Sequence, residues 1–447
     1  MTAGAARVPE HASGAGREWT SRGLAFVLAM PLGLLLAFGL YRFPPPAGLA
    51  VAGGAGVLML LALAVANLHA AVALGIGLLG VVLIEPAPAD GALCVVMAVA
   101  LVTGRFRLAA APRAAVAILA VLAALNVMSS IQVADAGRAA GFFAITLYLA
   151  AFALWLPGYV TSEGRAKLIV EAYLFAAVSS ALLGMLALAG VIPGAAVLTE
   201  GGRARALFQD PNVFGPFLVP AALIVAEELV RPRLLRLSTL TKALLLAILV
   251  LGVVFSYSRG AWLNLAVALA VMGVVLAARG GVRQALALVA IGLVGAAVVA
   301  GAVVATGSAD FLAERARPQT YDTTRFAGQR AGLQPAWEYP FGAGPGQFEA
   351  IAGISAHSTY ARAIGEQGFL GVLVLAALLG FTLGAAVRNA AGGRDTYGIG
   401  SAALLAAWCG LLANSAFIDT LHWRHLWLVT GLIWAGTMVG ARASRGR

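Results

Sequence analysis

The side chains best suited to chemistry in this sequence are three arginines and one histidine, and all four stand near the edges of apolar runs. Arg203 and Arg205 precede a short polar segment, Arg259 lies in a Ser-Tyr-Ser-Arg-Gly turn, and His357 follows a glycine-rich stretch. A guanidinium group binds phosphate oxygens through a two-point fork, which suits a diphosphate. Imidazole, with an ordinary pKa of about 6.5, is suited to moving a proton at neutral pH.

If the three arginines and His357 converge in one cavity, they predict group transfer from a lipid-linked diphosphate. The diphosphate is a good leaving group once its charge is neutralised. His357 would then remove the proton from an acceptor hydroxyl as that hydroxyl attacks a sugar. Five further polar residues are predicted to support this site: Asp210, Asn212, Ser258, Arg362 and Glu366.

Several of these residues also have a plain structural interpretation. Asp210 before Pro211 is a typical helix start, so Asp210 and Asn212 are open to being cap residues only. Arg259, near a helix end, is open to contact with lipid phosphate. The turn at 340–348 is rich in glycine, but no strand precedes it, which argues against a nucleotide-binding loop.

A metal site is the competing chemistry. His422 and His425 lie three residues apart and would need His357 as a third ligand. Arg424 lies between them and disfavours a bound cation. We therefore expect neither a metal nor another cofactor.

The elements that position these residues are predicted to be membrane helices, because 61% of the residues are hydrophobic and only 11% are charged. The expected fold class is all-α, a polytopic transmembrane bundle of about 12–14 helices, since about 20 apolar residues cross a bilayer. A large loop on the outer side, which the family resemblance described below makes periplasmic, is expected between the eleventh and twelfth helices. The apolar stretches are 24–41, 47–66, 70–84, 91–103, 114–130, 139–156, 168–190, 212–229, 243–256, 260–277, 284–306, 367–387, 398–416 and 425–440.

The net charge of +11 does not indicate nucleic acid, because of where the charge lies. With both termini cytoplasmic, most Lys and Arg residues fall on the inner side, as the positive-inside rule predicts. This topology places the polar motifs on the outer side. It divides the chain into four expected parts: N-terminal scaffold helices at 1–190, helices carrying the arginines at 191–306, a catalytic loop at 307–366, and C-terminal helices at 367–447.

Taken together, the motifs resemble those of the O-antigen ligase and O-antigen polymerase superfamily over about residues 195–435. The order is Arg-x-Arg, then Ser258-Arg259-Gly260, then a large outer loop, then His357-Ser358. After nine intervening residues comes Gly368-x-x-Gly371, which completes the histidine motif of that superfamily.

The resemblance implies a metal-independent, inverting glycosyltransferase in the bacterial inner membrane, with its active site facing the periplasm. The donor would be a glycan on undecaprenyl diphosphate, and the acceptor lipid A-core or another glycan, with membrane lipids as surroundings and no nucleic acid partner. By motif position, His357 resembles the catalytic base, and Arg259 with one of Arg203 or Arg205 resembles the diphosphate-binding pair. Ligase and polymerase stay open, and a lipid-linked oligosaccharide flippase is the alternative from another functional class.

Overall fold

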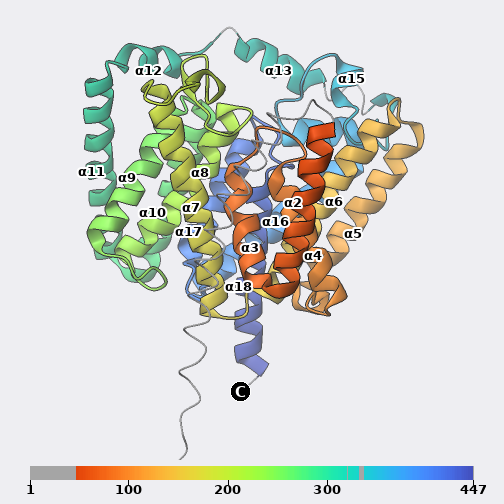
Figure 1. Cartoon of the computed structure of the whole chain (residues 1–447), viewed down its shortest axis with the longest axis horizontal. Helices are drawn as coiled ribbons and strands as arrows, with labels where there is room; N and C mark the ends of the chain where they lie inside the picture. Colours follow the sequence, from red (N-terminus) through yellow and green to blue (C-terminus); the bar gives the residue numbers. More distant parts are fainter. Residues whose placement is uncertain (1–46, 320, 332–336, 446–447) are drawn as a thin grey trace, which may run out of the picture.

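The computed structural model describes residues 47–319, 321–331 and 337–445, which form an all-α bundle (Figure 1). A two-stranded hairpin, β1 (Thr199–Glu200) and β2 (Arg203–Ala204), interrupts the helices. The helices are α2 (Ala47–Ala66), α3 (Leu68–Gly77), α4 (Pro88–Val102), α5 (Arg113–Ser129), α6 (Ala136–Tyr159), α7 (Glu163–Leu188), α8 (Pro211–Val230), α9 (Thr239–Phe255), α10 (Arg259–Gly280), α11 (Val282–Thr306), α12 (Ala309–Ala316), α13 (Tyr321–Ala331), α15 (Phe348–Ala352), α16 (Thr359–Ala391), α17 (Ser401–Ser415) and α18 (Arg424–Arg445).

Six of the described helices, α6, α7, α8, α10, α11 and α16, are long and apolar enough to cross a membrane. Shorter apolar helices accompany them, and the fold is that of an all-α membrane protein. Each apolar stretch predicted from residue 47 onward overlaps a helix, while the stretch 24–41 lies outside the described residues. The number of helices that cross the membrane stays a prediction.

Two predicted boundaries differ most from the ends of the helices. The stretch 70–84 stops being helical at Gly80, because the chain then turns and Val82 pairs with Phe208 in an isolated bridge. The stretch predicted to begin at 367 is already helical at Thr359, because Ser358 caps the new helix by accepting a hydrogen bond from the Ala361 amide at 3.4 Å. The loop that was predicted to extend to residue 366 therefore ends at Ser358, about two helical turns earlier.

Gly368 breaks α16 near its first third. Its backbone has φ 69° and ψ −169°, a region that only glycine adopts readily. A Cβ at this position would collide with the carbonyl oxygen of Pro340. The first two turns of α16 thus form a separate segment, set at an angle to the long membrane helix that follows.

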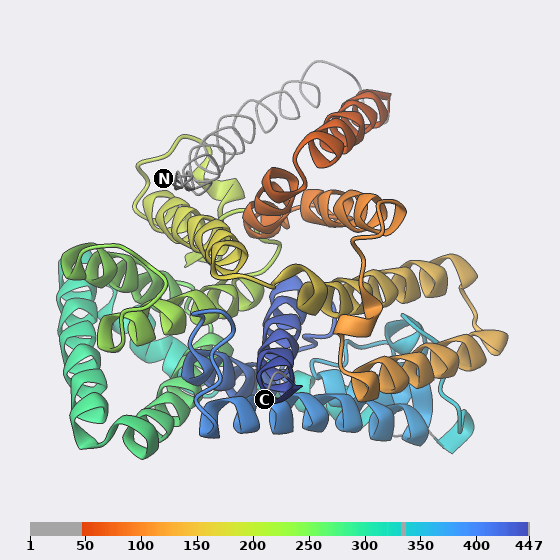
Figure 2. The ribbon, with the colours of Figure 1, turned by 90° about the horizontal axis from the view of Figure 1, so that it is seen from below.

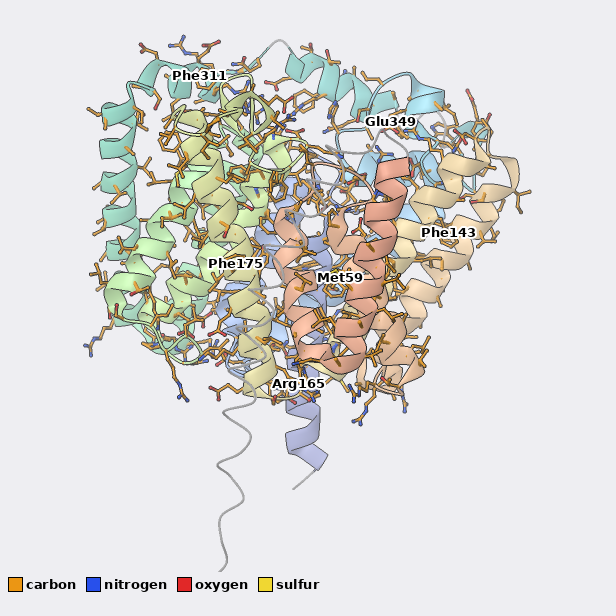
Figure 3. All side chains as sticks on the ribbon, in the orientation of Figure 1. Met59, Phe143, Arg165, Phe175, Phe311 and Glu349 are labelled. Carbon is orange, nitrogen blue, oxygen red and sulfur yellow. The ribbon has the colours of Figure 1, made fainter. Side chains whose placement is uncertain are left out.

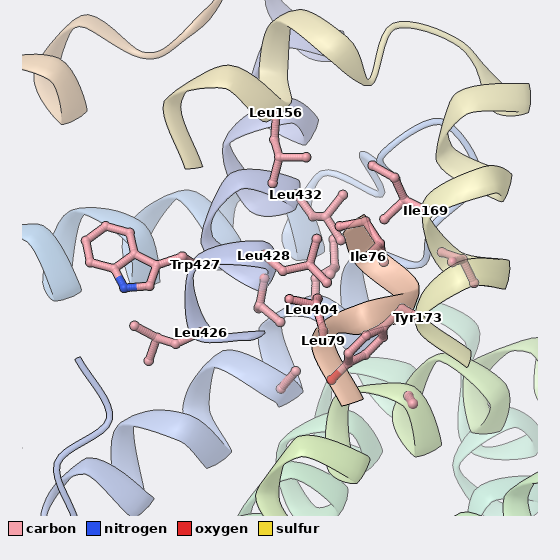
Figure 4. Packing of buried hydrophobic residues seen from close by; sticks show 14 of the residues in the cluster. Ile76, Leu79, Leu156, Ile169, Tyr173, Leu404, Leu426, Trp427, Leu428 and Leu432 are labelled. Atoms are coloured by element: carbon pink, nitrogen blue, oxygen red, sulfur yellow. The ribbon is translucent and has the colours of Figure 1, made fainter. Parts of the chain in front are cut away.

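The elements pack around α18, which Figure 2 shows near the centre of the bundle, with α8–α11 to one side and α5–α6 to the other. Side chains of α3, α7, α17 and α18 meet in the core (Figure 4). Tyr173 there donates a hydrogen bond to the carbonyl of Phe217 at 2.6 Å, which satisfies its buried hydroxyl. The N-terminal helices are therefore part of the same core as the helices that carry the polar motifs.

The segment between α11 and α16 lies across one end of the bundle, which we call the cap end; α12, α13 and α15 cover it (Figure 1). Phe311 and Glu349 mark this end in Figure 3, with Arg165 at the opposite end. The loop from 189 to 210 and the turns at 256–258 and 416–423 reach the same end. The fold thus gathers the polar motifs on one face.

Candidate functional site

Three of the helices that begin at the cap end have a side-chain cap from a motif residue. Asp210 accepts a hydrogen bond from the Asn212 amide at 2.7 Å at the start of α8. Ser258 accepts from the Ala261 amide at 3.3 Å at the start of α10, and Ser358 caps α16. Helix N-termini carry partial positive charge and unsatisfied N–H groups, so their shared location favours an anion nearby.

A cavity of about 240 Å³ opens between the starts of α8 and α10, the end of α17 and helix α13. Asn212, Ser258 and Arg259 contribute its polar wall, and α13 covers it with Asp322, Arg325 and Gln329. The full lining is Asn212, Ser258, Arg259, Gly260, Leu263, Asp322, Arg325, Phe326, Gln329, Asn414, Phe417 and Ile418.

Arg259, the first residue of α10, makes a two-point ion pair with Asp322 of α13. Its Nη1 donates to Asp322 Oδ2 at 2.9 Å, its Nη2 bonds Asp322 Oδ1, and Nη1 also reaches the Arg317 carbonyl at 3.2 Å. Hydrogen bonding from Arg259 lowers the pKa of Asp322, so this carboxylate stays charged at neutral pH. A guanidinium group that binds a carboxylate through two parallel hydrogen bonds can bind two oxygens of a phosphate in the same way.

The two arginines of the hairpin loop have different surroundings. Arg203 in β2 turns toward the cavity wall: its Nη2 donates to Asn212 Oδ1 at 3.0 Å, and its Nε to the Ser256 carbonyl at 3.1 Å. Arg205 donates to the carbonyls of Val197 and Gln209 at 3.2 and 2.9 Å, which belong to its own loop. The structure brings Arg203 to the cavity wall and directs Arg205 to its own loop.

Asn212 joins Arg203 to the turn before α10. Its Oδ1 also accepts a hydrogen bond from the Ser258 hydroxyl at 2.8 Å. Arg203, Asn212 and Ser258 thus form a continuous hydrogen-bonded wall that ends beside Arg259. The predicted supporting residues Asn212 and Ser258 lie in this wall, and Asp210 fixes the start of the helix that carries Asn212.

His357 lies beside the same cavity, just before the cap of α16. Its backbone is left-handed, with φ 45°, and its carbonyl accepts a hydrogen bond at 3.3 Å from Gln329, which lines the cavity. Burial lowers the pKa of His357, and the charge of Arg325 lowers it further, while Asp210 opposes the shift. The imidazole is therefore neutral at pH 7, the form that accepts a proton.

Arg362 and Glu366 lie one turn apart on the first segment of α16 and belong to an ion-pair network. Arg362 bonds Glu366 at 2.8 Å, forms an ion pair with Asp419 at 2.7 Å between Nε and Oδ2, and contacts Glu349 of α15. Glu349 also pairs with Arg138 of α6 at 2.9 Å. The network ties α6, α15, α16 and the 416–423 turn together beside His357, which is a positioning arrangement.

The glycine-rich turn at 340–348 packs against α16. The amides of Ala343 and Gly344 each donate to a carbonyl of residue 365 or 366 at 2.9 Å. The Phe348 amide donates to the Glu366 carboxylate at 3.3 Å. These N–H groups are used inside the fold, so the turn serves packing.

The two histidines of the alternative metal site, His422 and His425, have different partners in the structure. His422 hydrogen-bonds the Thr146 hydroxyl of α6 at 3.0 Å, and burial lowers its pKa to about 4. His425 is buried between Phe217 and Trp423. Within the described ranges, no group of three or more His, Cys, Asp or Glu side chains is arranged to hold a metal ion.

Four polar residues of the cavity lining were not among the predicted site residues: Asp322, Arg325, Gln329 and Asn414. Asp322 and Gln329 lie seven residues apart, two turns on one face of α13, a spacing that was available in the sequence. Asn414 lies at the cap end of an apolar stretch, where a polar residue indicates a specific contact.

Residues 244–376 match a family model described as O-antigen ligase. This segment contains Arg259, Asp322 and His357, while the hairpin with Arg203 lies before it. A search of curated proteins found no match to the chain.

Proposed function

We propose that the chain is a member of the O-antigen ligase family, whose model residues 244–376 match, and that it transfers a glycan from undecaprenyl diphosphate to an acceptor hydroxyl. The reaction class is that of an inverting glycosyltransferase without a metal. We propose the ligase reaction, with lipid A-core as acceptor, and polymerisation as the second outcome to be tested.

The observation that carries this proposal is the cavity at the cap end. It combines an arginine fork already gripping a carboxylate, a second arginine bonded to the cavity wall, and a neutral histidine whose carbonyl is bonded to a cavity residue. Neutralising a diphosphate and accepting a proton are the two tasks that glycan transfer from a lipid diphosphate requires.

A second, apolar cavity supports a lipid donor. It has a volume of about 1340 Å³ and runs between α8, α9, α10 and α11, from Thr239 at the start of α9 to Leu312 in α12. Thr239 is the sole polar side chain in its described lining. Helix α10 lines both cavities, so a prenyl chain in the apolar one would bring its diphosphate toward Arg259 at the start of the same helix.

The proposed chemistry follows from these positions. Arg259 and Arg203 hold the two phosphates, so that the negative charge that grows on the leaving diphosphate is compensated. His357 takes the proton from the acceptor hydroxyl, whose oxygen forms the new bond to the anomeric carbon as the carbon–oxygen bond to the diphosphate breaks. Attack opposite the leaving group inverts that carbon.

The proposed setting is the bacterial inner membrane, with the cap end in the periplasm and both termini in the cytoplasm. The distribution of Lys and Arg in the sequence supports this orientation. Nucleotides are scarce in the periplasm, and a lipid-linked diphosphate carries its own activation, which suits this location.

The test is a transfer assay with the full chain purified in detergent, a lipid-diphosphate-linked oligosaccharide and a lipid A-core acceptor. A gel shift of the acceptor is the result we expect. A ladder that grows on the carrier lipid without an acceptor would identify a polymerase. EDTA should leave the activity unchanged, and loss that zinc restores would contradict metal independence.

A further inference from the structure

Asn414 of α17 is a polar side chain for which the described part of the chain supplies no hydrogen-bond partner. It is 1% exposed, and among the described residues neither its Oδ1 nor its Nδ2 has a hydrogen-bond partner. A buried amide without partners is costly, on the order of 1–3 kcal/mol for each unsatisfied group. Retaining one inside an apolar helix interface therefore calls for a reason.

The position of Asn414 gives that reason, because the side chain lines the cavity that contains Arg259. The amide lies against Gly260, where a Cβ would be 2.6 Å from Asn414 Oδ1. Glycine after Arg259 is thus what lets α17 bring an amide next to the arginine fork. The contact joins the Ser258-Arg259-Gly260 turn to the last turn of α17.

The Asn414 amide has both a hydrogen-bond acceptor and a donor, and this limits the kinds of ligand that can satisfy it. Phosphate oxygens at neutral pH accept hydrogen bonds only, and they would satisfy Nδ2 but leave Oδ1 without a partner. A sugar hydroxyl both donates and accepts, so hydroxyl groups can satisfy both atoms. Since Arg259 is proposed to hold the diphosphate, the nearest sugar is the one attached to it.

We propose that Asn414 binds a hydroxyl group of the first sugar of the donor and so distinguishes a glycan-bearing lipid diphosphate from a bare one. The inference rests on the proposed function, because it takes Arg259 as the diphosphate site. Asn414 then contributes to recognition of the sugar, while Arg203 and Arg259 contribute to recognition of the phosphates.

The chain offers a matched control. Asn264 of α10 is also fully buried, and its Oδ1 and Nδ2 also lack partners among the described residues, but it does not line the cavity. It packs against Gly410 of the same helix, α17, that carries Asn414. Replacing either Asn264 or Asn414 by leucine removes a buried amide from the interface between α10 and α17. The side chain changes little in size.

The experiment measures binding of two lipids to the full chain in detergent, without acceptor: polyprenyl diphosphate, and the same lipid carrying one hexose. Asn414→Leu should weaken binding of the hexose-bearing lipid about tenfold and change binding of the bare lipid by less than about twofold. Asn264→Leu should leave both affinities near wild type. The thermal midpoint of donor-free Asn414→Leu should be equal to or above that of wild type, since an unsatisfied amide is gone.

Three results would overturn the proposal. Equal weakening for both lipids, no weakening for either, or the same effect from Asn264→Leu would each make Asn414 a structural residue. If Asn414→Leu does not fold, Asn414→Ala gives the same comparison without added bulk. Arg259→Lys serves as the separate check on the proposed function: bare lipid that binds this variant as tightly as wild type would remove the diphosphate site, and the assignment of Asn414 with it.

Discussion

Asp322 forms a two-point ion pair with Arg259, so a diphosphate bound at Arg259, as we propose, would have to displace the Asp322 carboxylate. Removing the charge with Asp322→Asn should tighten diphosphate binding. The two side chains are 27% and 21% exposed, so the pair lies between a surface and a buried ion pair. Exposed pairs contribute about 0.2–1 kcal/mol, and the two-point geometry places this one near the upper value, about fivefold in affinity.

Asparagine is a conservative choice, because it keeps an oxygen that can accept from the Gln319 amide, as Asp322 Oδ2 does at 2.8 Å. The assay is titration calorimetry of the detergent-solubilised full chain with inorganic diphosphate. Asp310→Asn in α12 is the control, since it removes an exposed carboxylate from the same cap without touching Arg259. Equal or weaker binding by Asp322→Asn would refute the reasoning, and would mean that Asp322 orients Arg259 for its ligand.

Three further predictions follow from the cavity and the helix break. Arg203→Gln should weaken diphosphate binding about 10- to 100-fold, as loss of a charge-assisted contact implies, and Arg205→Gln should have little effect; the reverse order in a binding assay would reassign the pair. Arg325→Gln removes a positive charge that lowers the pKa of His357, so the acid limb of the pH–rate profile should move to higher pH, and an unmoved limb would exclude His357 as the titrating base. Gly368→Ala should destabilise the protein by about 1–3 kcal/mol through its backbone alone, measured by thermal unfolding, and an unchanged midpoint would contradict the requirement for glycine.

Helix positions followed from the sequence because a membrane helix needs a long apolar run and caps of defined type. Asp210 before Pro211 indicated the start of α8 correctly. The start of α16 was misplaced because its first two turns carry Arg362 and Glu366, whose charges resemble a loop until their ion pairs are known. Gly368 was recognised as part of a motif, but nothing in the sequence showed that its backbone breaks the helix.

Within the candidate site, residue types were predictable and partners were not. The sequence could not show which of Arg203 and Arg205 faces the cavity, because they are the same residue type two positions apart. The hairpin and the left-handed backbone of Ala206, with φ 50°, give the two arginines different surroundings. The pairing of Arg259 with Asp322 spans 63 residues and depends on how α13 lies across the bundle. Asn414 reaches the cavity only through the packing of α17 on α10, which a single sequence does not reveal.

His357 as the proton acceptor is the central claim, and the most direct test separates binding from turnover in one variant. We would measure donor affinity and glycan transfer side by side for wild type and His357→Ala at saturating donor and acceptor. The account predicts donor affinity near that of wild type, with transfer reduced by about 100- to 10,000-fold. Transfer near the wild-type rate in the variant would contradict it.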